Sequence, residues 1–362
     1  MKIGNLDLGR KLLLAPMADV TDSAYRKIAK EFGAGLTFTQ MVSAKGVIRN
    51  QFETLKRLSF HRSEKPVGVQ ILGKDPDLIR SAVKDIVTLK PDIIDINCGC
   101  SVEKVTKHGF GSDLLDKPQQ LGAIIKNMVG ASWGIPISAK IRLGRNKTKI
   151  NVLEIAKVIE DNGASVIIVH GRTRADKYDT DAEWDWIAKV KESVSIPVVG
   201  NGSCFTPKDV MNMIEHTKCD SVMIARGAIG NPFIFSRFNE LVETGTDPGQ
   251  PNPEIVRDTA IKHLNLMIEN FGEHVGLNKA KKHLIWYFMS FNGITPFIDL
   301  VMPQNDKDEL VDMLFEHSEK IINEKYPEED FNKINENFKE KVLFWMKDKI
   351  EDDVQLSKEE LM

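Results

Sequence analysis

The amino-acid sequence predicts an α/β fold in which a (β/α)8 TIM barrel is followed by a C-terminal all-helical domain. Eight short apolar segments alternate with amphipathic segments in the first part of the chain. Most of the apolar segments lack polar alternation, which is typical of parallel strands covered on both faces. Eight strand–helix units in about 230 residues agree with such a barrel in number and in length.

The expected strands are residues 12–18, 36–42, 67–72, 93–96, 137–143, 166–170, 197–200 and 222–225. The expected barrel helices include residues 23–31, 76–89, 118–129, 152–161, 184–193 and 207–216. Asp22 is a helix N-cap candidate, and Asp75-Pro76 and Thr206-Pro207 each place a capping side chain before a proline at the first helical position. A doubly wound sheet is the alternative fold. It usually has fewer strands and a glycine-rich turn after the first strand, and residues 14–18 contain no such turn.

The pattern changes near residue 236, and only helical segments follow. A loop at 247–253, rich in proline, glycine and asparagine, precedes expected helices at 254–271, 277–291, 307–325 and 332–349. Gly293 and Pro296 separate the second of these from the third. We therefore expect three parts: a barrel at 1–236, a helical domain at 237–325 and an acidic helical extension at 326–362.

Charge is distributed unevenly along the chain. Residues 241–362 hold 25 Asp and Glu against 14 Lys and Arg, a net charge of −11, whereas residues 1–240 carry +8. A basic barrel favours a polyanionic partner. No apolar segment suits a signal peptide or reaches the roughly 18 residues that span a membrane. The four cysteines do not form a disulfide framework, so we expect a cytoplasmic protein with reduced thiols. As a separate expectation, a monomer is favoured over an oligomer.

In a barrel of this type the active site lies at the carboxyl ends of the strands. Amide, cationic and glycine residues gather there without a cluster of carboxylates, so we expect no metal site. The candidates are Pro16, Met17, Gln70, Asn97, Cys100, Lys140, Arg142, His170, Arg172, Asn201, Gly202, Ala225, Arg226 and Gly227.

Several of these residues suggest a phosphate-bearing cofactor. Asn201-Gly202 and Arg226-Gly227 follow the seventh and eighth strands, where barrels commonly bind phosphate through accessible backbone N–H groups. Gln70 offers both a donor and an acceptor for a uracil-like ring edge. Lys140 offers positive charge for the N1/O2 edge of a reduced flavin. A single such Gln is more often structural and a single Lys more often solvated, so the inference depends on their occurring together.

Seven motifs in the barrel, taken in order, resemble the tRNA-dihydrouridine synthase family. They are residues 15–22, 70–73, 95–101 followed by 104–105 and 109–115, 140–144, 170–173, 200–202 and 223–232. Residues 282–287 resemble the family's helical domain, so the resemblance implies that the helical domain at 237–325 is of RNA-docking type. The resemblance implies an oxidoreductase that binds FMN in the barrel mouth. It further implies that NADPH provides the electrons to reduce uridine to dihydrouridine in RNA, specifically tRNA.

The resemblance also implies a role for each candidate residue. Gln70 and Lys140 would hold the isoalloxazine ring, which the backbone at Pro16 and Met17 would flank. Asn97, Arg142 and Arg172 would orient the target base, and Cys100 would be the general acid. Cys100 is favoured over Cys98 because it follows the glycine, as the family's acid does. The ribityl phosphate would be held by His170, Asn201, Gly202, Ala225, Arg226 and Gly227.

The chain departs from the family pattern at Ser101, where proline is usual, at Gln40, where Glu is common, and in its acidic C-terminal region. These departures keep other readings open: a flavin-dependent ene-reductase of a small pyrimidine or enone, an enzyme for rRNA, or an RNA-binding or assembly protein that keeps FMN as structure. If RNA is the substrate, we expect basic residues around the barrel mouth to hold it. These are Lys104, Lys107, Arg142, Arg145, Lys147, Lys149, Arg172 and Arg174.

Overall fold

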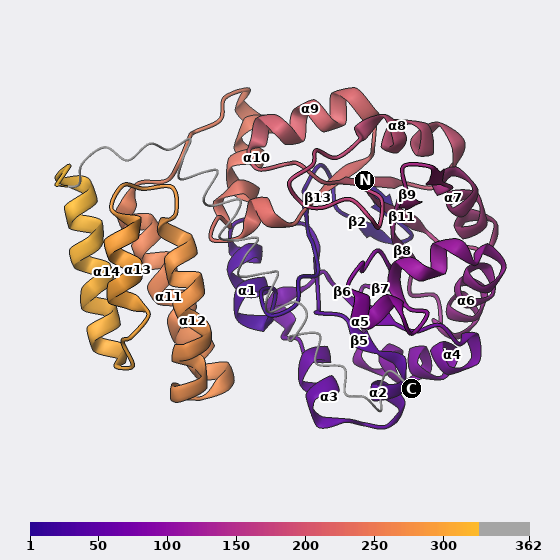
Figure 1. Cartoon of the computed structure of the whole chain (residues 1–362), viewed down its shortest axis with the longest axis horizontal. Helices are drawn as coiled ribbons and strands as arrows, with labels where there is room; N and C mark the ends of the chain where they lie inside the picture. The colour runs from indigo at the N-terminus through magenta and orange to yellow at the C-terminus, as the bar shows by residue number, and fades with distance from the viewer. Residues whose placement is uncertain (326–362) are drawn as a thin grey trace.

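The computed structural model describes residues 1–325, and the predicted extension at 326–362 lies outside the described residues. The apolar segments form a ring of parallel strands with helices on its outside, as predicted (Figure 1). The strands run in the order β3, β13, β12, β11, β8, β7, β6 and β4. Their bounds are β3 Leu13–Leu14, β4 Thr37–Phe38, β6 Val67–Leu72, β7 Ile93–Cys98, β8 Ile137–Arg142, β11 Val166–His170, β12 Val198–Asn201 and β13 Ser221–Ile224.

The ring closes between its first and last strands. β3 pairs in parallel with β13, and Leu13 forms a parallel bridge with Leu36, next to β4. The backbone N–H of Leu14 donates to the Leu36 carbonyl oxygen at 2.9 Å. Inside the ring the aliphatic side chains of every strand are buried, so the barrel is a packed core and its open end is the place for a site.

The first two expected strands are shorter than predicted. Of residues 12–18 only β3 is extended sheet, because Pro16 has no N–H to continue the ladder. The segment predicted at 36–42 divides into β4 and β5, Val42–Ser43, both of which pair with β6. The segment between these short pieces, residues 39–41, is therefore loop that faces the barrel mouth.

Helices cover the ring from outside. The predicted N-cap residues act as such: Asp22 Oδ1 accepts from Tyr25 N–H at 3.1 Å, and Thr206 forms a capping box with Asp209. The helices are α1 Ser23–Glu31, α4 Pro76–Ile86, α6 Pro118–Ala131, α7 Val152–Asp161, α8 Trp184–Ser193, α9 Pro207–Thr217 and α10 Phe233–Thr244. The predicted domain boundary at residue 236 falls within α10.

Shorter elements fill the connections. The helices α2 Ala44–Ile48, α3 Phe52–Leu58 and α5 Glu103–Thr106 follow β5 and β7. Two small hairpins pair β1 Lys2–Ile3 with β2 Leu6–Asp7 and β9 Gly144–Asn146 with β10 Lys149–Ile150. The 3₁₀ turns are η1 Arg62–Glu64, η2 Val87–Leu89, η3 Gly111–Asp116 and η4 Arg226–Ala228.

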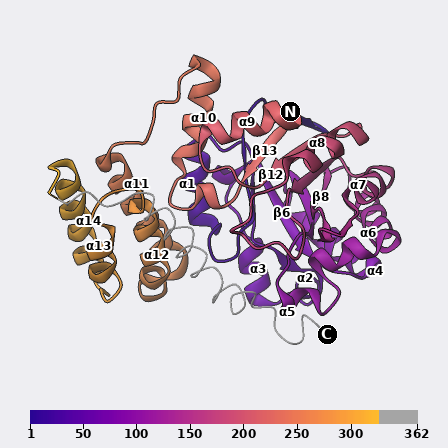
Figure 2. The ribbon, with the colours of Figure 1, turned by 45° about the horizontal axis from the view of Figure 1, so that its top comes forward.

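A separate group of helices follows the barrel, as predicted, and lies to one side of it in two views (Figures 1 and 2). Its members are α11 Pro253–Phe271, α12 Glu273–Phe288, α13 Ile294–Val301 and α14 Lys307–Ile322. α13 was not predicted. Gly293, with a φ of 83°, is the residue before α13 begins, and Pro296 lies in the first turn of α13, where a helix tolerates the missing N–H.

The helical group is joined to the barrel through α1 and the loop before it. Tyr25 of α1 lies between the groups: its hydroxyl donates to the Ala228 carbonyl oxygen, and its ring centroid lies 5.5 Å from that of His263 in α11. Asp19, in the β3–α1 loop, accepts from Lys279 at 2.5 Å and also from Lys282, both in α12. Within residues 1–325 no helix is both long and apolar enough to cross a membrane.

Candidate active site

Two adjoining cavities lie at the carboxyl ends of the barrel strands, and every predicted site residue lines one or both of them. They have volumes of about 110 and 170 Å³ and share Pro16, Met17, Lys140, His170 and Tyr178. The first, the phosphate-side cavity, also contains Arg172, Asn201, Gly202, Ala225, Arg226 and Gly227. The second, the thiol-side cavity, is also lined by Gln70, Asn97, Cys100, Arg142 and Ser101, the last being the residue that stands where the family usually has proline.

The strand register explains why these residues meet. Asn97 of β7 is paired with Lys140 of β8, while His170 of β11 is paired with Arg142 on one side and Asn201 on the other. Side chains that are far apart in sequence therefore stand at the same level of the ring. Lys140 Nζ crosses the mouth and donates to Asn201 Oδ1 at 3.2 Å.

A chain of hydrogen bonds leads from the barrel interior to the Cys100 loop. Asp95 Oδ2 accepts from Gln70 Nε2 at 2.7 Å, and Gln70 Oε1 accepts from Asn97 Nδ2 at 2.9 Å. Asn97 Oδ1 then accepts from the backbone N–H groups of Gly99, at 3.1 Å, and Cys100, at 2.9 Å. Since a carboxylate can only accept, Asp95 sets the orientation of both amides and with it the position of the Cys100 backbone.

Asp95 was not among the predicted site residues. Its carboxylate is fully buried and also accepts from Ser138 Oγ at 2.6 Å. Burial raises the pKa of Asp95 to about 6, against the lowering effect of its bonds to Ser138 and Gln70. A buried acid in the middle of an apolar strand is the sequence signal that could have identified it.

The two cysteines of this loop have different surroundings. Cys98 points into the core, fully buried, and burial raises the pKa of its thiol well above the usual range. Cys100 lines the thiol-side cavity. Burial raises the pKa of Cys100 too, while a Val102 backbone N–H, Arg142 and Lys140 act in the opposite direction. Cys100 is therefore protonated at neutral pH and is placed to give its proton to a group in the cavity.

Four cations gather at the mouth: Lys140, Arg142, Arg172 and Arg226. Within residues 1–325 none of them forms an ion pair with a carboxylate. Burial, together with repulsion from Arg142, lowers the pKa of Lys140 to about 8. Burial and the neighbouring arginines also lower the pKa of Arg172 to about 10. This uncompensated positive charge favours an anionic ligand.

Hydrogen bonds hold two of these arginines in place. Arg142 donates from Nε to the Gly99 carbonyl oxygen and from Nη1 to that of Thr173, both at 2.8 Å. Arg172 donates from Nε to the Thr180 carbonyl oxygen at 2.8 Å, and its Nη1 lies 3.1 Å from His170 Nε2. A guanidinium only donates, so His170 Nε2 accepts and the ring is neutral. Burial and the surrounding cations lower the pKa of His170 well below its usual range.

Glycine is required at two points of the phosphate-side cavity. Gly202 has a φ of 121°, a conformation that other residues rarely adopt. At Gly227 a Cβ would collide with the Cys204 carbonyl oxygen, so glycine lets η4 pack against the loop after β12. These two glycines allow the loops after β12 and β13 to meet at one wall of the cavity.

Tyr178 lines both cavities, although the sequence patterns did not indicate it. It lies in the long loop after β11, where no periodic pattern marks a side chain that turns inward. Its ring lies under the Arg226 guanidinium, with 4.9 Å from Cζ to the ring centroid, and its hydroxyl accepts from Arg142 Nη2 at 3.4 Å. An aromatic residue in a loop after a barrel strand is the only sequence signal for it.

Comparisons with known proteins agree with this geometry. The family model described as dihydrouridine synthase matches residues 13–325. The tRNA-dihydrouridine synthase B of Vibrio parahaemolyticus is 37% identical over 298 residues, which cover 82% of this chain and 92% of the relative. The probable tRNA-dihydrouridine synthase 1 of Synechocystis sp. is 34% identical over 316 residues, with 87% and 88% covered. Among solved structures, histamine dehydrogenase from Rhizobium sp. 4-9 has a TM-score of 0.55 at 14% identity, covering 78% of this chain and 50% of that one, a likeness of fold alone. The match over the barrel and the four helices beside it means that the chain belongs to the dihydrouridine synthase family.

Proposed function

We propose that this protein reduces the C5–C6 double bond of uridine in RNA, specifically tRNA, to dihydrouridine, with FMN as its bound cofactor and NADPH as the reductant. The observation that carries the proposal is the Cys100 thiol standing beside a cavity lined by uncompensated cations. Family membership supports the reaction, and the names of the relatives support tRNA as the substrate. The cytoplasm, where tRNA is found, is the proposed location.

The residues present fit FMN. Lys140, Arg142, Arg172 and Arg226 form no ion pair in the described part of the chain, and their charge suits a phosphate dianion and an electron-rich ring. Arg226, His170, Asn201, Ala225 and the glycines at 202 and 227 would hold the ribityl phosphate. Gln70 and Lys140 would hold the ring, with Pro16 and Met17 beside it. When bound and reduced, the flavin supplies a hydride to C6 of the uracil.

The protein's own residues would do the remaining chemistry. Arg142, Arg172 and Asn97 would orient the uracil so that its C5 faces Cys100. Cys100 Sγ then gives its proton to C5, and the resulting thiolate is stabilised by Lys140 and Arg142 until water reprotonates it. The hydrogen bonds from Asn97 Oδ1 keep the thiol loop in place during this transfer.

The reductant and the RNA would use the same mouth in turn. The sequence contains no glycine-rich dinucleotide motif, so NADPH is proposed to reach the flavin before the RNA enters.

The predicted RNA-binding residues differ in whether they already form ion pairs within the protein. Arg145, Lys147 and Arg174 form ion pairs with Asp116, Asp176 and Asp113. Lys104, Lys107 and Lys149 form none within residues 1–325, so they are the better candidates for phosphate contacts.

The test combines flavin analysis with mass spectrometry of nucleosides. The purified protein should carry FMN that NADPH bleaches, and it should convert uridine to dihydrouridine in a tRNA transcript that lacks modifications. Strains with and without the gene then identify the tRNA and the position. A protein that takes up no FMN, or that reduces FMN but leaves every RNA unchanged, contradicts the proposal.

A further inference from the structure

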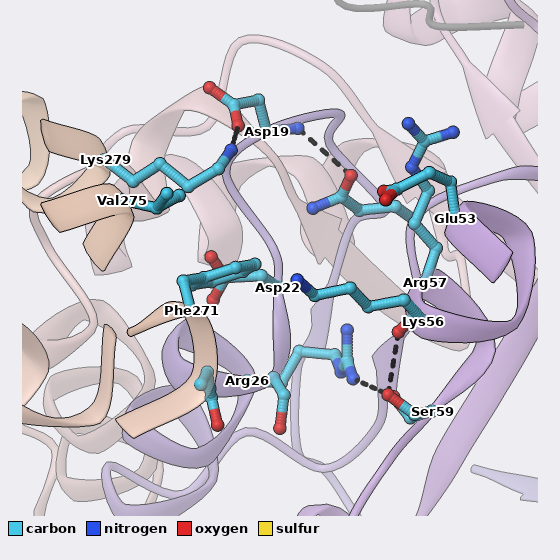
Figure 3. A pocket seen from close by; sticks show the side chains of 13 residues that line it. Asp19, Asp22, Arg26, Glu53, Lys56, Arg57, Ser59, Phe271, Val275 and Lys279 are labelled. Carbon is cyan, nitrogen blue, oxygen red and sulfur yellow. Dashed lines mark hydrogen bonds and ion pairs between the residues drawn. The ribbon is translucent and has the colours of Figure 1, made fainter. Parts of the chain in front are cut away.

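A third cavity, of about 370 Å³, lies between the barrel and the helical group, outside the active site (Figure 3). The barrel side is formed by α1, α3 and the loops that carry Asp19 and Gln40. The opposite side is formed by the end of α11 and the start of α12, including Asn270, Phe271 and Lys279. Its size lies within the range of pockets that hold small organic ligands.

The wall of this cavity combines an aromatic ring with cations. The ring of Phe271 has Lys56 Nζ at 4.8 Å and Lys279 Nζ at 5.4 Å from its centroid, and Figure 3 shows the Lys56 ammonium facing the ring. Lys279 forms an ion pair with Asp19, which Lys282 shares, whereas within residues 1–325 Lys56 forms no ion pair. Arg57 lies on the same side of the cavity as Lys56. An aromatic face beside cations is the combination that binds a base and its phosphate.

The cavity also offers hydrogen-bonding groups that suit the edge of a base. Asn270 Nδ2 is buried and has no hydrogen-bond partner in the described structure, a condition that is rare for a buried donor. Gln40 Oε1 accepts from the Asp19 backbone N–H at 3.2 Å. This bond fixes the orientation of the side-chain amide, so that its amino group, Nε2, points away from Asp19. Side-chain amides pair with base edges because they carry a donor and an acceptor side by side.

The cavity is next to the active site along the chain. Asp19 is two residues after Met17, and Gln40 directly precedes Met41, and both methionines line the thiol-side cavity. Two residues of extended chain span at most about 7 Å. A nucleotide in the third cavity is therefore close enough to belong to the same RNA strand as a uridine at the active site.

We propose that this cavity binds an unpaired nucleotide that neighbours the reduced uridine in the RNA. The base stacks on Phe271 and pairs its edge with Asn270, while Lys56 and Arg57 contact its phosphate. The nucleotide thereby touches the barrel and the helical group together, so the RNA is recognised by their junction. This proposal rests on the proposed function, since it takes RNA as the substrate.

The experiment is a thermodynamic cycle between the protein and the RNA. A tRNA transcript is prepared with single abasic positions within three nucleotides of the modified uridine, and its affinity for the FMN-loaded protein is measured by fluorescence anisotropy. At one of these positions the abasic change should weaken binding to the unaltered protein by about 5-fold to 100-fold, the effect of one lost stack. The same change should have almost no effect on binding to Phe271→Ala.

Matched variants separate stacking from general damage. Phe315→Ala removes a half-exposed Phe of α14 that also carries a cation, Arg257, at 4.3 Å from its ring, and it should leave the abasic effect intact. Phe271→Trp should restore the effect, because tryptophan also stacks. Lys56→Gln should lower the salt slope of binding by about one unit, whereas Lys189→Gln, at a lysine placed over Trp186 on α8, should not.

The outcomes distinguish this proposal from the function on which it rests. If the protein makes dihydrouridine in the transcript but no abasic position is coupled to Phe271, the nucleotide site is wrong and the function stands. If Phe271→Trp behaves as Phe271→Ala does while both keep FMN, stacking is refuted. If the unaltered protein neither binds nor reduces the RNA, the proposed function itself fails.

Discussion

Replacing Asp95 by asparagine tests the hydrogen-bond chain that supports the Cys100 loop. Asp95 accepts hydrogen bonds from Gln70 and Ser138. Gln70 in turn accepts from Asn97, and Asn97 accepts from the backbone N–H groups of Gly99 and Cys100. An asparagine at 95 presents a donor to one of these partners. If both amides rotate to accommodate it, the Asn97 amino group faces the two loop N–H groups. At least one donor is then left unpaired, at about 1 to 3 kcal/mol.

The pH dependence of stability gives the magnitude. The folded-state pKa of Asp95 is about 6, raised from 3.8, so its contribution to stability is present below pH 3.8 and is lost as the pH rises through 6. At pH 5 the carboxyl is mostly protonated in the folded protein and mostly ionised in the unfolded chain. From pH 8 to pH 5, the folding stability of the unaltered protein should therefore rise by about 1.4 kcal/mol relative to Asp95→Asn.

Urea unfolding of both proteins at pH 5 and pH 8 measures this difference, and the rate of dihydrouridine formation at pH 8 measures the effect on Cys100. Asp95→Asn should keep FMN but reduce uridine more slowly. Ser138→Ala is the control. It removes the other hydrogen-bond donor to Asp95 but leaves the orientation of the Gln70 and Asn97 amides unchanged, so it should raise the pKa of Asp95 and keep most of the activity. A stability difference that is the same at both pH values would refute the reasoning.

Further predictions concern the acid, the ring-edge cation and the RNA surface. Cys100→Ala should slow uridine reduction by about 10² to 10⁴ while NADPH still reduces the flavin, and Cys98→Ala should have little effect on either step. The charge of Lys140 is present below about pH 8, so FMN affinity, measured by fluorescence titration, should fall as pH rises through 8, and Lys140→Met should flatten that profile. Lys107→Gln should lower the salt slope of RNA binding by about one unit. Deleting the acidic residues 328–362 should leave RNA affinity unchanged or increase it, and loss of RNA binding with FMN retained would contradict the charge argument.

The barrel and most of its mouth could be predicted because both follow from strand pattern. Continuous apolar segments mark strands buried on both faces, and in a parallel ring their carboxyl ends must meet. Gln70, Asn97, Lys140 and His170 each lie at or near such an end, so their proximity follows from the topology alone. The family motifs added the expected roles, which remain predictions.

The residues that could not be predicted act through tertiary contacts. Tyr178 enters the mouth from a loop whose course depends on Arg142 and Arg226, and no local pattern encodes that course. Asp95 stands within an apolar strand, where its role depends on partners from β6 and β8. The Asp19 ion pairs join segments 260 residues apart, and such pairings leave no periodic signal.

The ring closure has a consequence for synthesis of the chain. β3 emerges from the ribosome early, but its partner β13 comes much later, and the Ser221–Lys11 hydrogen bond that accompanies this pairing joins residues 210 positions apart. At bacterial or eukaryotic translation rates the first strand waits roughly 10 to 40 s for that partner. During this interval the nascent barrel keeps two open strand edges, which are templates for pairing with other chains. Ribosomes stalled before residue 221 should therefore display aggregation-prone chains that bind chaperones, and release past β13 should remove both properties at once.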